Sequence, residues 1–206
     1  MAEGIPVTRI EVPMSRINAI RDAVRSVTHL GDGPDASRLA GPEDAPALLA
    51  FLSDPAVHAP IYTLPRPLTE ASVETFITDH LAQQADGEGL LFVREDRDGA
   101  IVGYSDIQVW PHWAAGELGG ALDPSLHHQG RGTAGAAMSF SWMFRALHLD
   151  LICETASPEN VPTHRLLDGL GFERRGEVTS VRTDGTTRAS LVWEAMRADW
   201  FDRHKD

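Results

Sequence analysis

A glycine-containing loop between a short apolar run and a long helical segment is the feature that most constrains the fold of this chain. The apolar run covers residues 119–122, and Gln129-Gly130-Arg131-Gly132-Thr133-Ala134 leads into a helical pattern over residues 132–147. Gly130 and Gly132 let a ligand approach the backbone without a Cβ in the way. The first helical turn has N–H groups without intrahelical partners, and these favour an anion together with the helix dipole. This order of strand, loop and helix, with Arg131 adding positive charge, predicts a site for a phosphate-bearing ligand.

Two segments of the chain carry a family pattern. Gln129-x-x-Gly132-x-Ala134 resembles the Q/R-x-x-G-x-G/A signature of the GNAT superfamily of acyl-CoA-dependent N-acyltransferases, in which this loop binds the pyrophosphate of coenzyme A. Residues 160–176 resemble that superfamily's N-x-x-S/A…L-x-x-x-G-F-x-x-x-G segment. The leucine at position 167 and the sequence of residues 191–200 resemble the pattern of the branch of ribosomal-protein N-terminal acetyltransferases (RimJ/RimL-like). The resemblance extends over residues 38–200.

The resemblance implies an α/β (α+β) fold with a mixed, mostly antiparallel sheet that splays at the acyl-CoA site and carries helices on both faces. The pantetheine arm would enter where the strand before the loop separates from the strand after the central helix, and would contact the backbone of Ala121 and Leu122. The pyrophosphate would bind Gln129, Gly130, Arg131, Gly132, Thr133 and Ala134. Asn160 would lie near the pantetheine end.

Local patterns agree with one such domain over residues 36–206. Strands are predicted at 37–40, 90–95, 100–110, 116–122, 149–155, 172–182 and 188–196, and helices at 43–53, from 69, at 132–147 and at 161–170. The helix at 132–147 is apolar on more than one face and should be largely buried. Residues 56–68 contain several prolines and predict an irregular connection.

Residues 1–35 form a separate N-terminal appendage in this interpretation. Residues 7–12 alternate as in a strand, and residues 15–27 carry apolar positions at helical spacing, with Ser15 as a candidate cap. The glycines and proline at 31–35 then interrupt regular structure. We expect the appendage to pack on the domain or on a neighbouring subunit of a homodimer.

Composition limits the class of partner and compartment. A net charge of −12 argues against binding to nucleic acid or anionic membranes. The acidity suits solubility and could attract cationic substrates. The single cysteine, Cys153, fits a reducing compartment and is expected to be a buried apolar side chain. No apolar run is long enough to predict a transmembrane helix or a signal peptide, so the expected location is the cytoplasm.

The expected chemistry needs a base for the attacking amine and a proton for the leaving thiolate. Glu117 is the first candidate base, and Asp106, on the neighbouring strand, is the second. Many GNAT members have a tyrosine acid at the position that Leu167 occupies here. The thiolate could therefore leave unassisted, through water, or with help from a nearby side chain: Ser157, Thr163 or His164.

The resemblance implies that the connection carrying Tyr62 borders the acceptor side. Trp110 and His112 form an aromatic cluster at a strand end, which predicts that they line an acceptor pocket. His127 and His128 are expected at the surface, with no metal site, because adjacent side chains point apart and no further ligand stands at the right spacing.

The sequence thus predicts an N-acetyltransferase that moves an acetyl group from acetyl-CoA to a primary amine of a small molecule or peptide. Two alternatives remain open. One is a non-catalytic acyl-CoA-binding module, and the other, which the second motif disfavours, is a protein that binds a different phosphate ligand.

Overall fold

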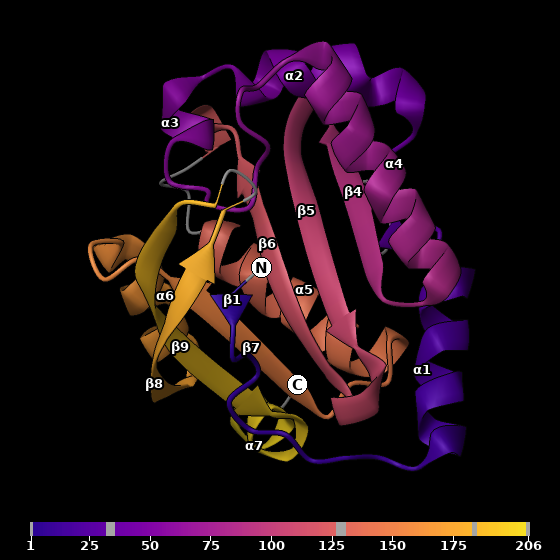
Figure 1. Cartoon of the computed structure of the whole chain (residues 1–206), viewed down its shortest axis with the longest axis vertical. Helices are drawn as coiled ribbons and strands as arrows, with labels where there is room; N and C mark the ends of the chain where they lie inside the picture. Colours follow the sequence, from indigo (N-terminus) through magenta and orange to yellow (C-terminus); the bar gives the residue numbers. More distant parts are fainter. Residues whose placement is uncertain (1, 32–35, 127–130, 183–184, 205–206) are drawn as a thin grey trace.

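The computed structural model describes residues 2–31, 36–126, 131–182 and 185–204. The strands of these residues form one sheet in the order β1-β8-β9-β7-β6-β5-β4-β3-β2 (Figure 1). Their bounds are β1 Ala2–Glu3, β2 His29–Leu30, β3 Ser37–Leu39, β4 Gly89–Glu95, β5 Ile101–Trp110, β6 Ala115–Leu122, β7 Leu151–Ala156, β8 Glu173–Val181 and β9 Thr187–Met196. Within this part of the chain, β6 and β7 are the one parallel pair. The predicted mixed, mostly antiparallel sheet is confirmed.

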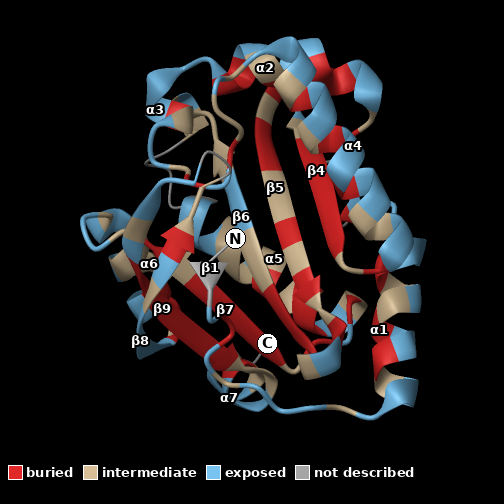
Figure 2. Ribbon diagram, in the orientation of Figure 1, coloured by how far each residue is buried: buried red, intermediate tan, exposed pale blue. Residues whose placement is uncertain are grey.

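Helices cover both faces of the sheet. Their bounds are α1 Met14–Ser26, α2 Ala45–Leu52, α3 Pro55–His58, α4 Glu70–Asp86, α5 Arg131–Ala146, α6 Val161–Leu170 and α7 Arg197–Arg203. One core joins α1, α5, α6 and α7 to one face, and a second core joins α2 and α4 to the other face of β4 and β5. Figure 2 shows buried residues along the central strands between these layers.

Local sequence signals account for several element ends. The Thr69 side chain accepts from the Ser72 N–H, and Ser72 Oγ accepts from the Thr69 N–H, which satisfies free donors at the start of α4. Helix α6 ends at Gly171, whose φ of 87° closes the helix in a conformation that favours glycine. The β4–β5 hairpin turns at Gly99, with φ of 82°. These three predicted boundaries are confirmed.

Strands β6 and β7 pair only where they begin. Ala115 lies opposite Leu151 and Gly116 opposite Ile152, whereas β7 pairs with β9 over residues 151–156. The remainder of β6, up to Leu122, therefore separates from β7 and leaves a wedge in the sheet. We call this opening, between residues 117–122 of β6 and the second half of β7, the wedge.

The N-terminal residues differ from the predicted strand at 7–12. No regular strand forms there, because the N–H groups of Val7 and Thr8 donate to Oε1 of Glu194 at 2.7 and 2.9 Å instead of pairing in a ladder. Ser15 is not the cap of α1. The helix follows Pro13, whose carbonyl accepts from the N–H groups of Arg16 and Ile17.

The described part of residues 1–35 reaches both edges of the sheet. Strand β1 pairs with β8, and β2 pairs with β3. Ile5 is 4% exposed and packs with Cys153 and Val192. Figure 1 shows the chain crossing from β1 past α7 to α1. A domain boundary at residue 35 stays a prediction.

Two further predictions need correction. The connection at 56–68 overlaps a short helix, because α3 extends to His58 and is capped by Asp54, whose carboxylate accepts from the Ala56 N–H. Helix α5 is buried only in its second half, at Phe140, Met143 and Phe144. Its first turn is exposed because it extends beyond the core. None of the helices in the described ranges is long and apolar enough to cross a membrane.

Candidate active site

The first turn of α5 offers open space for a ligand. Gly132, Thr133 and Ala134 are exposed, and a Cβ placed on Gly132 would meet no atom within 4 Å. The helix has 16 residues, so its N-terminal N–H groups and dipole favour an anion. Gln129 and Gly130 lie outside the described residues, and Arg131 begins the helix. The spacing of glycines at 130–135 also fits a dinucleotide-binding pattern, but that pattern requires a parallel sheet, unlike this one.

The open half of β6 presents backbone groups to the wedge in alternation. The Leu118 N–H faces β7, because it donates to Oε1 of Glu154 at 2.8 Å. The Asp123 N–H faces the other way and donates to the Val102 carbonyl. By this alternation Leu122 shares the direction of Leu118, and Ala121 is turned toward β5. Their contact with the pantetheine arm stays a prediction.

Glu117 lies on β6 where the wedge begins. It is partly buried, and Thr155 on β7 donates its hydroxyl to Oε1 of Glu117 at 2.7 Å. Burial raises the pKa of this carboxyl to about 7, against the lowering effect of the Thr155 hydrogen bond. A carboxyl with this pKa can accept a proton near neutral pH, which suits a general base.

Asp106 forms a pair with His80 of α4, a residue that the sequence analysis missed. His80 Nε2 lies 3.0 Å from Asp106 Oδ1, and His80 Nδ1 lies 2.7 Å from the Phe76 carbonyl oxygen. Because a carbonyl only accepts, Nδ1 carries a proton, and the two side chains share a further proton between Nε2 and Oδ1. Burial lowers the pKa of His80, but Asp106 and the Phe76 carbonyl outweigh this effect and raise it. The sequence signal was a histidine on the apolar face of a helix, which does not reveal its partner.

Glu154 is a second residue that the sequence analysis did not single out. It is 7% exposed and lies in the wedge against Leu118. Burial, followed by the charge of Glu117, raises its pKa well above the usual range. The local sequence around Glu154 does not indicate this contact, because Leu118 lies 36 residues earlier in the chain.

Asn160 caps α6, with its side-chain oxygen accepting from the Thr163 N–H at 3.3 Å. Leu167 is buried at 1% exposure. His164, one of the residues considered for thiolate release, places Nε2 2.8 Å from the Ser157 carbonyl oxygen. This hydrogen bond fixes the His164 ring. To donate the Nε2 proton to the leaving thiolate, His164 would have to give up the bond to the Ser157 carbonyl.

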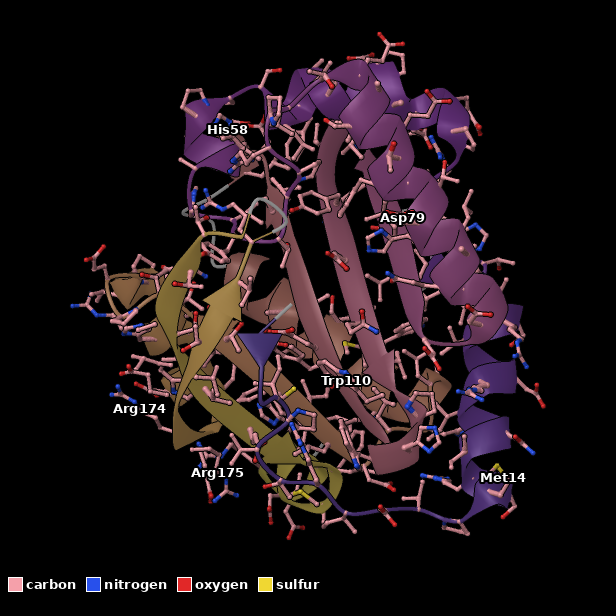
Figure 3. All side chains as sticks on the ribbon, in the orientation of Figure 1. Met14, His58, Asp79, Trp110, Arg174 and Arg175 are labelled. Atoms are coloured by element: carbon pink, nitrogen blue, oxygen red, sulfur yellow. The ribbon has the colours of Figure 1, made fainter. Side chains whose placement is uncertain are left out.

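The predicted acceptor residues lie in two places. Tyr62 donates its hydroxyl to the Thr186 carbonyl at 2.6 Å, at the turn between β8 and β9. Trp110 and His112 line a hollow of about 580 Å³ at the other end of β5, with Val12 and Ile17. Figure 3 shows Trp110 far from His58, which precedes Tyr62 in the chain. The structure therefore does not bring the three side chains together.

Comparison with known proteins settles the family. Residues 38–173 match the model of the acetyltransferase (GNAT) domain. The chain belongs to the GNAT acetyltransferase family. The predicted family and fold are confirmed, and membership supports the prediction of an acyl-CoA-dependent acetyltransferase.

Solved structures of similar fold include a ribosomal-protein acetyltransferase and a RimJ protein. This GNAT chain superposes on the ribosomal-protein-S5-alanine acetyltransferase from Vibrio fischeri with a TM-score of 0.68 and 19% identity, covering 84% of this chain and 99% of the other. It superposes on Mycobacterium smegmatis RimJ, solved in complex with CoA-disulfide, with a TM-score of 0.67 and 24% identity, covering 80% and 82%. The predicted RimJ/RimL-like resemblance is confirmed at the level of the fold.

A curated relative is similar over part of its length. The uncharacterized N-acetyltransferase YnaD from Bacillus subtilis (strain 168) is 22% identical over 108 residues, which span 52% of this GNAT chain and 62% of YnaD. Within the described residues, no group of three or more His, Cys, Asp or Glu side chains could hold a metal ion. Cys153 is buried, and burial raises the pKa of its thiol well above the usual range, which disfavours a role as nucleophile.

Proposed function

We propose that this protein transfers an acetyl group from acetyl-CoA to a primary amine within a ternary complex. The observation that carries the proposal is the position of Glu117, a carboxyl with a pKa of about 7, where β6 leaves β7. The exposed first turn of α5 follows β6 and supports binding of the coenzyme A pyrophosphate. A donor held along β6 would bring its thioester to the carboxyl.

The residues of the wedge supply the steps that the reaction requires. Glu117 takes a proton from the acceptor ammonium, and the neutral amine attacks the thioester carbonyl carbon. The new C–N bond forms, the C–S bond breaks, and the nitrogen loses its remaining extra proton, which the leaving thiolate takes up directly or through water. The products are the amide and the thiol of coenzyme A, and the first proton passes from Glu117 to solvent. The Leu118 N–H points into the wedge, where it can donate to the developing oxyanion in place of Glu154.

We favour a peptide or protein N-terminus as the acceptor. Support comes from the fold shared with ribosomal-protein acetyltransferases. A small-molecule amine is the other acceptor class. The cytoplasm as its location and a homodimer as its assembly stay predictions.

A non-catalytic acyl-CoA-binding module is the second candidate, because Leu167 occupies the position of the usual tyrosine acid. Calorimetry with acetyl-CoA tests binding, and thiol release on a panel of peptide and small amines tests catalysis. The proposed function predicts binding and amine-dependent thiol release. Binding without release on any amine would favour the module, and absence of both would overturn both candidates.

A further inference from the structure

Two arginine side chains meet one tyrosine beside the β8–β9 turn. The guanidinium carbons of Arg182 and Arg188 lie 4.4 and 4.3 Å from the centre of the Tyr62 ring. Tyr62 is itself fixed by its hydrogen bond to the Thr186 carbonyl. We call Arg182, Arg188 and Tyr62 the arginine pair site.

The positive charge of this site is not balanced by the described residues. No carboxylate among them forms an ion pair with Arg182 or Arg188, and Arg182 Nε is buried without a hydrogen-bond partner there. Burial lowers the pKa of Arg188, and the nearby Arg182 lowers it further. Two like charges in a chain of net charge −12 form a local site that favours an anion.

The arginine pair site and strand β6 lie on opposite sides of the wedge. Ile61, Leu64 and Leu68 pack with Tyr104 of β5 and Ala121 of β6, whereas Tyr62 contacts the β8–β9 turn. In the sheet, β7 and β9 lie between β6 and β8. The connection that carries Tyr62 must therefore cross the open end of the wedge, with the arginine pair at its far side.

Strand register gives the spacing between the arginine pair and Glu117. Thr155, which binds Glu117, lies opposite Val192 on β9, and Arg188 precedes Val192 by four residues on the same face. Four strand residues span about 13 Å along the strands, and the two steps from β6 through β7 to β9 add about 10 Å across the sheet, which makes a separation of about 16 Å. The carboxylate of a free amino acid lies too close to its own amine to cover this spacing. An extended peptide covers it in about five residues, and in fewer when long side chains reach toward each other.

We propose that Arg182 and Arg188 bind an acidic side chain at the second to fourth position of a peptide acceptor, while its N-terminal amine lies at Glu117. This inference rests on the proposed function and specifies its substrate class. The carboxylates of β5 and β6 receive the ammonium, and the arginine pair receives the acidic residue.

Two synthetic peptide amides test the inference. Both begin with alanine and differ only in having glutamate or glutamine at the second and third positions. Wild-type protein should have the lower KM and the tighter calorimetric Kd for the glutamate peptide. The double variant Arg182→Gln/Arg188→Gln should lose about tenfold or more of this preference, with the KM for acetyl-CoA unchanged.

Two variants serve as controls. Arg174→Gln removes another β8 arginine, which lies over Trp193, and should keep the preference. Asp184 lies between Arg182 and Arg188 in the sequence and outside the described residues, and Asp184→Asn should also keep the preference. Equal Kd values for the two peptides in wild-type protein would overturn the inference. A double variant that keeps the peptide preference and is weakened only in its affinity for acetyl-CoA would also overturn it. Because calorimetry needs no turnover, it tests the arginine pair even if thiol release, and with it the proposed function, fails.

Discussion

At the scale of single residues, the partly buried carboxyl of Glu117 links function to stability. Its pKa in the folded protein is about 7, above the ordinary value of 4.5, so the folded state binds this proton more tightly than the unfolded state. The contribution to stability is complete below pH 4.5 and is lost as the pH rises through 7. The free energy of unfolding of Glu117→Gln minus that of wild type should therefore increase between pH 4 and pH 8. The increase should be up to about 3 kcal/mol in favour of the variant. Urea unfolding at both pH values measures this, and a difference that does not change with pH would contradict the assigned burial.

His80 is expected to act as a positioning residue through Asp106. Its raised pKa favours the imidazolium, whose charge offsets that of Asp106. Because the charge of Asp106 raises the pKa of Glu117, His80→Gln should move the pH midpoint of kcat/KM to higher pH. Asp106→Asn added to His80→Gln should move it back. A purely structural role predicts lower stability in His80→Gln, with an unmoved midpoint.

At the scale of elements, the start of α5 is predicted to bind coenzyme A without supporting the core. Gly132→Val adds a side chain into open space, so the melting temperature should change little. The same side chain obstructs a pyrophosphate at the helix N-terminus, and the Kd for coenzyme A should rise. Gly169→Val in α6 is a matched control, because its Cβ also meets no atom within 4 Å. Equal Kd values in the two variants would remove α5 from the site.

The N-terminal segment is expected to unfold together with the sheet. Ile5 is 4% exposed, whereas Val7 is 46% exposed two residues later. Ile5→Ala should lower the free energy of unfolding by about 2 kcal/mol or more, in a single transition. Val7→Ala should change it by less than about 0.5 kcal/mol. Two separate transitions in denaturant would show instead that the segment unfolds as an independent unit.

At the scale of the whole molecule, the sequence predicted what depends on local pattern and motif. The helix at 161–170 and the hairpin around Gly99 follow from caps, turn residues and periodicity, and the wedge follows from the family resemblance. Residues 7–12 alternate as a strand would, but they do not form one. The N–H groups of Val7 and Thr8 donate instead to Glu194, which lies 187 and 186 residues later in the chain.

Contacts between distant segments account for the remaining differences in the candidate site. The pairs His80–Asp106 and Leu118–Glu154 join elements that no local pattern connects. The resemblance implies an acceptor side at the connection that carries Tyr62, whereas Trp110 and His112 are predicted there as an aromatic cluster at a strand end. Trp110 lies six positions after Tyr104 on β5, a span of about 20 Å, and Tyr104 packs beside the connection that carries Tyr62.

The pH dependence of kcat/KM for a peptide amine, in wild type and in Glu117→Gln, tests the central claim most directly. If Glu117 accepts the proton of the acceptor, the wild-type value should rise with an apparent pKa near 7. The variant should lose roughly 100-fold in kcat, the range typical of general acid–base groups, with acetyl-CoA affinity little changed. A variant with the wild-type kcat and the wild-type pH profile would contradict the assignment of Glu117 as the base.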